Sequence, residues 1–298
     1  MKRPALLLTV LLCCAVAASS DAPKRPGILG IAYVKILVSD ETTAADFYSL
    51  ALESAPPAKL NVNGSQPCTW CEHRPMNIRK QKQHVGPVKL EVTSDRRVTN
   101  RLAEVAFRTN DVKKLRAFLL SKGLSPGELG KCADDPCFNL NDPENHCLIF
   151  VASPAEPRII HAGFIVHDRT ATEHFYKDIL GFRPYWHGGM KDDQTDWVSM
   201  QVPDGTDWLE FMVNVEPDAD QRLRGIMNHI AIGVTDIHAA QKKLQENGVK
   251  LTEQPQIGRD GKWQLNLYDP DLTRIEFMEF TPVQKPCCSE YTGPHPKP

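Results

Sequence analysis

Hydrophobic and polar positions follow one pattern four times along this chain. An alternating strand ends at an aspartate, an amphipathic helix stops near a glycine, and further strands complete the repeat. Alternation with a period of two predicts a half-buried strand, and an aspartate at the junction is a favourable N-cap for the next helix. The four opening strands are AYVKILVSD, EVAFRTND, HAGFIVHD and HIAIGVTD, which end at Asp40, Asp111, Asp168 and Asp236.

The helix of the third repeat illustrates the helical part of the pattern. Ala171, Phe175 and Ile179 recur at every fourth position, so they share one helix face, and Gly181 follows as a stop signal. The segment Ser-Pro-Ala-Glu-Pro at residues 153–157 separates the second repeat from the third. We therefore expect two halves of two repeats each, with the helices packed on one face of the strands.

A histidine opens the first strand of the third and fourth repeats, and a glutamate lies in the closing strand of each. The pairs are His161 with Glu210 and His229 with Glu276, and nearly the same length of chain separates the members of each pair. Two imidazoles and two carboxylates together make a mixed nitrogen and oxygen site for a divalent metal ion. A lone strand histidine is usually structural, but two pairs at matched repeat positions favour metal binding.

Strand alternation places these four residues on one face. Side chains two residues apart point the same way, so His229 shares a face with Ala231 and Gly233, while Ile230 lies on the other face. The same reasoning for the other three strands puts every candidate ligand on the face away from the helices. A curved sheet can form a cup on that face.

Composition indicates a folded, secreted protein that does not bind nucleic acid. The 298 residues, 41% of them hydrophobic, suffice for roughly two domains, and a net charge of −2 argues against a nucleic-acid surface. Lys2 and Arg3, followed by an apolar run over residues 5–18, predict a signal peptide over residues 1–20 and a secreted or periplasmic protein. The run is too short for a membrane span, so we expect no membrane partner beyond secretion.

The cysteines predict disulfides more readily than redox chemistry. A CxxC pair at residues 68–71 lies among loop residues, which favours a structural disulfide or idle thiols. Cys132 and Cys137 flank a turn-like segment and can pair with each other or with the earlier couple. Cys287 and Cys288 lie in a proline-rich tail, where no neighbouring residue completes a soft-metal site.

With these motifs, the sequence resembles the vicinal oxygen chelate superfamily, whose unit is a βαβββ module and whose paired modules form a metal-bearing cup. The resemblance implies an α+β fold of four βαβββ modules, arranged as two tandem domains at residues 28–152 and 157–281, followed by a tail at 282–298. The second half is most similar to glyoxalase I. The segment from Tyr268 to Glu276 resembles that family's DPDGxxIE strand, with Leu272 in place of its glycine.

The resemblance also implies roles for individual residues. The metal ligands are His161, Glu210, His229 and Glu276, which bind one divalent ion drawn from Zn, Ni, Mn, Co and Fe. Asn214 matches a family asparagine that contacts glutathione, and Arg224 resembles a basic residue just before the second histidine. Lys177 and Asp178 replace the arginine of the family's first helix, which puts glutathione recognition in question. Further substrate candidates on the cup face are Trp208 and Asn266.

The first half departs from the metal-binding pattern. The positions that correspond to the four ligands are Tyr33, Glu91, Glu104 and Ile149. Tyrosine and isoleucine remove half of the ligand set, so we expect a metal-free scaffold in residues 28–152. Assembly stays open, because four modules in one chain can satisfy internally the pairing that shorter relatives obtain by forming dimers.

The function implied by the resemblance is that of a metal-dependent lyase or isomerase for a small molecule. Its substrate is an α-hydroxycarbonyl or hemithioacetal-type compound, and Glu276, assisted by Glu210, transfers a proton through an enediolate. An extradiol ring-cleaving dioxygenase is the alternative, although Asn266 stands where that family has a tyrosine. A third reading is a protein that sequesters a ligand without turnover, of the bleomycin-resistance type.

Overall fold

The computed structural model describes residues 23–52, 82–95, 98, 100–152 and 159–298. The predicted signal peptide, the CxxC pair at residues 68–71 and the linker at 153–157 lie outside the described residues or at their limits. None of the described helices is both long and apolar enough to span a membrane.

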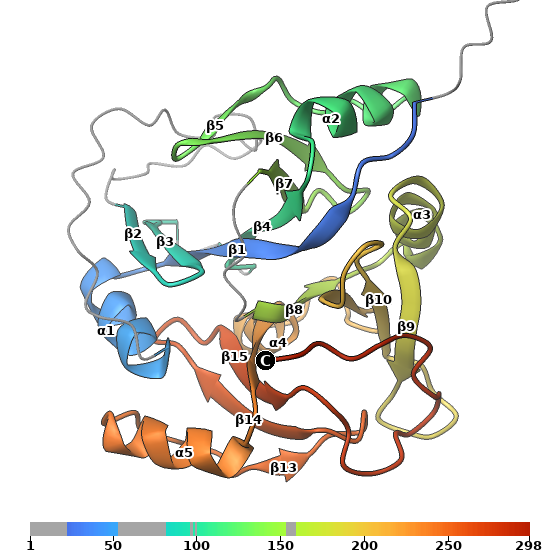
Figure 1. The fold of residues 1–298 in the computed structure, drawn as a ribbon. Helices are drawn as coiled ribbons and strands as arrows, with labels where there is room; N and C mark the ends of the chain where they lie inside the picture. Colours follow the sequence, from blue (N-terminus) through green and yellow to red (C-terminus); the bar gives the residue numbers. More distant parts are fainter. Residues whose placement is uncertain (1–22, 53–81, 96–97, 99, 153–158) are drawn as a thin grey trace, which may run out of the picture.

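Two sheets form the molecule, one from each half of the chain (Figure 1). The first sheet has seven strands in the order β2 (Lys82–Val85), β3 (Val88–Val92), β1 (Ile28–Val38), β4 (Leu102–Thr109), β7 (Cys147–Val151), β6 (Asp135–Asn141) and β5 (Gly130–Cys132). Its helices are α1 (Glu41–Leu52) and α2 (Val112–Ser121).

The second sheet repeats this topology with eight strands. Their order is β13 (Gln256–Ile257), β14 (Trp263–Tyr268), β15 (Arg274–Glu279), β12 (His229–Val234), β8 (Ile159–Ile165), β11 (Trp208–Met212), β10 (Trp197–Gln201) and β9 (Arg183–Gly188). In each sheet the opening strands of the two modules are antiparallel neighbours, β1 with β4 and β8 with β12. Each of these strands also has a parallel neighbour from its own module. The predicted α+β fold of paired modules is thereby confirmed.

The four aspartates act as the predicted helix caps. The side chains of Asp111, Asp168 and Asp236 accept hydrogen bonds from backbone N–H groups of the first turn of α2, α3 (Arg169–Glu173) and α5 (Ile237–Glu246). Asp40 accepts a 2.8 Å hydrogen bond from the Thr43 N–H in the same way. An Asp side chain at this position satisfies donors that the helix itself leaves unpaired.

The third-repeat helix differs from the regular helix that its periodicity predicts. After five residues α3 widens into the π-helix η2 (His174–Ile179), which ends before Gly181 at φ +81°. Both Phe175 and Tyr176 on this turn are buried. Neighbouring positions of a regular helix point about 100° apart, so the wider turn goes with the burial of two consecutive aromatic rings.

The C-terminal tail, residues 282–298, has no helix or strand and crosses the second sheet (Figure 1). It also carries one of the two disulfides whose cysteines both lie in the described residues, between the adjacent Cys287 and Cys288. The other joins Cys132 to Cys137 across β5 and β6, which decides between the two pairings that the sequence allows. A short helix, α4 (Gln221–Met227), precedes β12.

Candidate metal centre and substrate cavity

The four predicted ligands come from four adjacent strands in the middle of the second sheet. Their order is β15, β12, β8 and β11, which carry Glu276, His229, His161 and Glu210. The register of the strands brings the four side chains together, because Ala231 of β12 lies opposite both His161 of β8 and Glu276 of β15.

The ligand atoms converge within a few ångströms. The Nε2 atoms of His161 and His229 are 3.0 Å apart. Glu276 Oε2 lies 3.7 Å from each of these nitrogens, and Glu210 Oε2 lies 3.6 Å from that of His229. Gly163 makes room for this approach, because a Cβ atom there would lie 2.2 Å from the His229 ring. Any larger residue at this position would displace the imidazole.

This arrangement fits a divalent metal ion. His229 Nδ1 donates a 2.9 Å hydrogen bond to the Met227 carbonyl oxygen, so its Nε2 can present a lone pair to the cluster. Metal–nitrogen bonds of about 2.1 Å at a right angle place two nitrogens about 3.0 Å apart. The separation of 3.0 Å between the two histidines matches that geometry, and the carboxylates lie slightly outside it.

Burial shifts the pKa of each group in the cluster in the direction that favours its uncharged form. Desolvation lowers the pKa of both imidazoles well below the usual value, so they are neutral and able to bind a metal. Desolvation raises the pKa of Glu276 to about 7. For Glu210, desolvation and then the nearby Glu276 charge raise the pKa to about 8. A divalent ion would reverse the shift of both carboxyls, because it stabilises the carboxylates.

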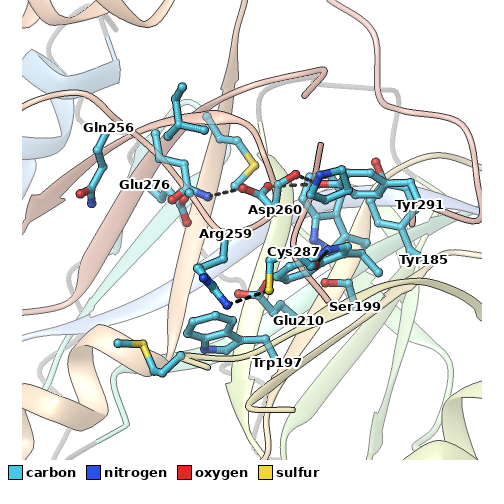
Figure 2. Close-up of a pocket in the computed structure, with 18 of the residues that line it drawn as sticks. Tyr185, Trp197, Ser199, Glu210, Gln256, Arg259, Asp260, Glu276, Cys287 and Tyr291 are labelled. Atoms are coloured by element: carbon cyan, nitrogen blue, oxygen red, sulfur yellow. Dashed lines mark hydrogen bonds between the residues drawn. The ribbon is translucent and has the colours of Figure 1, made fainter. Parts of the chain in front are cut away.

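A cavity of about 670 Å³ opens onto this cluster (Figure 2). Glu210 and Glu276 lie in its wall, where Asn266 and Ser199 add polar groups. Aromatic side chains form much of the remaining wall. They are Tyr185, Trp186, Trp197, Trp208 and Tyr291.

The tail closes one side of this cavity, which no pattern in the sequence predicts. The Tyr291 hydroxyl donates a 3.1 Å hydrogen bond to the Asp260 carboxylate, and the Cys287 N–H donates a 2.7 Å hydrogen bond to the Arg259 carbonyl oxygen. On the opposite side of the cup, Thr292 N donates to the Tyr185 carbonyl oxygen at 3.0 Å. The tail therefore bridges the two edges of the second sheet.

Two of the four predicted substrate residues line the cavity. Trp208 is buried, with its ring centroid 4.7 Å from that of His161, and Asn266 donates a 3.0 Å hydrogen bond to Glu253. Asn214 and Arg224 are not in the cavity wall. Asn214 donates to the Thr195 carbonyl oxygen at 2.8 Å, and Arg224 to the Ala219 carbonyl oxygen at 2.7 Å.

Lys262 is a cavity neighbour that the sequence argument missed. Its side chain is fully buried, and its Nζ lies 4.4 Å from the centroid of the Trp208 ring. Side chains two residues apart share a face, so Lys262 shares a face with Asn266, which the sequence assigns to the cup. Strand alternation could therefore have predicted that Lys262 lies beside the cavity.

The corresponding site of the first half holds a lysine ammonium among the ligand positions. Lys35 Nζ lies 3.2 Å from Glu91 Oε2 and also contacts Glu104 Oε1. Tyr33 receives the Lys89 ammonium over its ring face at 3.2 Å, and Ile149 packs in a small apolar cluster. A cation built into the protein thus neutralises the two carboxylates. That residues 28–152 bind no metal stays a prediction.

Comparison with known proteins shows a family likeness in the second half of the chain. Residues 158–277 match the model of the Glyoxalase/Bleomycin resistance protein/Dioxygenase superfamily. The lactoylglutathione lyase of Haemophilus influenzae is 27% identical over 124 residues, which cover 41% of this chain and 92% of that protein. Residues 158–277 are thus similar to this superfamily, and they carry the sequence match.

Some solved structures resemble the fold of this chain over both of its halves. A variant of homoprotocatechuate 2,3-dioxygenase from B. fuscum superposes with a TM-score of 0.60 at 17% identity, covering 92% of this chain and 74% of that chain. The complex of this dioxygenase from Brevibacterium fuscum with 3,4-dihydroxyphenylacetate gives a TM-score of 0.56 at 16% identity, with 92% and 84% covered. At these identities the likeness shows the shared fold.

Proposed function

We propose that this protein is a metal-dependent lyase or isomerase that moves a proton within an α-hydroxycarbonyl or hemithioacetal-type substrate. The observation that carries the proposal is the convergence of two neutral imidazoles and two carboxylates at the base of a cavity. A divalent ion held by His161, Glu210, His229 and Glu276 would supply Lewis acidity to two neighbouring substrate oxygens.

The protein's own contribution is proton transfer by Glu276. Its carboxyl lines the cavity and lies 3.7 Å from the Nε2 atoms of both histidines, so it would be within reach of a substrate bound at the metal as a general base. It would take the proton next to the carbonyl group, forming an enediolate, and return the proton to the adjacent carbon. Glu210 stands on the other side of the histidines and would assist. The Trp208 ring keeps water from one flank of the cluster.

Hydrogen exchange tests this proposal. Protein purified with its metal retained, or loaded with Zn, Ni or Co, is incubated in D₂O with α-hydroxyketones and hemithioacetals, and deuterium at the α-carbon is followed by NMR. We expect incorporation that survives replacement of iron by these metals. The Glu276→Gln variant should lower the rate by roughly 100-fold or more. Exchange no faster than in buffer, across the screened compounds, would reject the proposal.

One observation favours the ring-cleaving dioxygenase as a second candidate. Asn266 lacks the phenol of that family's tyrosine, but Tyr291 of the tail brings a phenol into the cavity wall. Iron-dependent oxygen uptake with a catechol, measured with an oxygen electrode, would promote this candidate. Tight ligand binding without turnover of any compound would instead support the sequestering role.

A further inference from the structure

Several buried polar atoms around the cavity have no hydrogen-bond partner among the described residues. They include Arg274 Nε, Lys262 Nζ and Asn266 Oδ1. Buried polar groups are nearly always paired, because each unpaired one leaves desolvation uncompensated. Arg274 and Asn266 line the cavity, and the rings around Lys262 line it as well. Other unpaired buried atoms are distributed over both halves of the chain, but these three meet at one cavity, where a bound ligand could pair with them.

Arg274 is the cation best placed to meet that ligand. It lies on β15 two residues before Glu276, so both side chains point to the cavity. The side chain is 17% exposed, and its Nη2 is 3.9 Å from Glu276 Oε2, which is too far for a hydrogen bond. Its guanidinium therefore keeps donors for a group bound beside the metal cluster.

Lys262 places a second positive charge behind the aromatic wall. Its Nζ lies 4.4 Å from the ring centroid of Trp208, 5.1 Å from that of Tyr291 and 5.6 Å from that of Tyr185. The ring faces attract the ammonium but accept no hydrogen bond of normal strength. In this low-dielectric region the charge acts on the cavity with little screening.

Most charged groups of the site have a nearer partner than a substrate once a divalent ion is counted. The ion offsets Glu210 and Glu276, Asp260 offsets Lys262, and Arg259 pairs with Asp192. The further anion Glu253 accepts hydrogen bonds from Asn266 and Tyr268. Arg274 is the cavity cation with no carboxylate within hydrogen-bond distance, and an anionic group of the substrate would supply one.

We infer that the substrate carries a carboxylate in addition to its chelating oxygens, and that Arg274 binds this carboxylate. The inference rests on the proposed function, because it uses the metal cluster to fix the other end of the substrate. Guanidinium groups bind carboxylates through two parallel hydrogen bonds, which makes Arg274 a determinant of specificity. Asn266 Oδ1 is free to accept a hydrogen bond from a substrate hydroxyl.

Two ligands that differ only in charge test this inference. Succinic acid monohydroxamate and its terminal amide share one chelating hydroxamate, but only the first has a free carboxylate. Calorimetry with nickel-loaded full-length protein measures both dissociation constants. We expect the carboxylate to bind about tenfold more tightly than the amide, and Arg274→Met to reduce that ratio to about one. Arg274→Lys should recover part of it.

The ratio of the two affinities corrects for any general effect on the metal site. Lys285→Met is the matched control, because Lys285 is also in the cavity wall but is 82% exposed and paired with Glu290. That variant should keep the wild-type ratio. Equal affinities in the wild type, or a ratio that Arg274→Met leaves unchanged, would overturn the inference. Absence of binding by either hydroxamate to the nickel-loaded protein would count against the proposed function itself.

Discussion

The Nε2 atoms of His161 and His229 face each other because each imidazole is fixed by its surroundings. His161 packs on Trp208, and His229 fits into the space left by Gly163 while its Nδ1 donates to Met227. A hydrogen bond of the kind that His229 makes orients a metal ligand and contributes substantially to affinity. The Nδ1 atom of His161 has no such partner among the described residues, so packing on Trp208 positions that ring. At the residue scale, the cluster is already organised for an ion.

The first prediction concerns metal occupancy. His161→Ala and His229→Ala should each weaken binding of Zn or Ni by at least about 100-fold, because each removes one nitrogen ligand. His174→Ala is the matched control, since His174 is exposed and pairs with Asp178. Metal content per chain after dialysis measures the effect. Full occupancy in both cluster variants would place the metal elsewhere.

A second prediction links stability to pH. In the metal-free protein, burial raises the pKa of Glu276 to about 7 and of Glu210 to about 8, so the folded state holds these protons more tightly than the unfolded state. Their contribution to stability is therefore complete at low pH and is lost as pH rises through these values. Lys262, whose pKa is lowered to about 8 by burial, titrates mainly above this window.

Urea unfolding at pH 6 and pH 7.5 checks this prediction. The two glutamates should lower the stability of the chelator-treated protein by about 2 kcal/mol per pH unit over this range. The two buried histidines, whose pKa is lowered, act in the opposite direction and should offset roughly half of this loss. The metal-loaded protein should not show the loss. Glu210→Gln should flatten the dependence of the metal-free protein. Equal stability of the metal-free protein at both pH values would contradict the assigned pKa shifts.

At the element scale, the central strands of the two sheets carry different side chains on the cup face. In the first sheet, β1 lies between β3 and β4, and Lys35 of β1 contacts Glu91 and Glu104 on these neighbours. In the second sheet, the equivalent strands carry His161 and Glu210 and supply no lysine to the cluster. One module pair thus encloses its own cation, and the other leaves room for an ion.

The third prediction follows from this difference. Lys35→Met should destabilise the protein by about 3 kcal/mol, because it leaves two buried carboxylates without their cation. Lys114→Met removes the exposed pair with Asp111 and should change stability by less than about 1 kcal/mol. Denaturant unfolding compares the two variants. Added Mn²⁺ or Ca²⁺ should partly restore Lys35→Met, and indifference to both the substitution and the ions would contradict the assignment.

At the scale of the whole molecule, each half stabilises a loop of the other. Tyr48 of α1 donates a 3.0 Å hydrogen bond to Asp269, and Tyr176 of the third-repeat helix donates one of 3.0 Å to Asp142. Both contacts are buried, and the two aspartates occupy equivalent turns. Only the turn at Asp269 leads into a strand with a candidate metal ligand, Glu276.

The fourth prediction uses these two tyrosines as a matched pair. Tyr48→Phe and Tyr176→Phe should each lower the free energy of unfolding by about 1–3 kcal/mol, because each leaves a buried carboxylate with one donor fewer. Metal affinity should fall only in Tyr48→Phe, since that contact holds the turn before Glu276. Titration with a fluorescent metal competitor compares them. An equal loss of affinity in both variants would show that the halves affect the cluster only through global stability.

The sequence alone determined the repeated modules, the four caps and the four candidate ligands. Alternation and helical spacing are local properties, so HAGFIVHD and HIAIGVTD assign His161 and His229 to one face without any tertiary contact. The matched distances to Glu210 and Glu276 then predict a cluster, which the adjacent central strands confirm geometrically. Whether the cluster binds a metal stays a prediction.

Only the tertiary structure decided what surrounds the cluster. The tail with Tyr291, the burial of Lys262 among three rings, the Lys35 ion pairs and the contacts between halves all join residues far apart in the chain. No local periodicity encodes such contacts, because they depend on which surfaces meet after the sheets have formed. The strand pattern fixes where the ligands point, and long-range packing determines the shape and charge of the space before them.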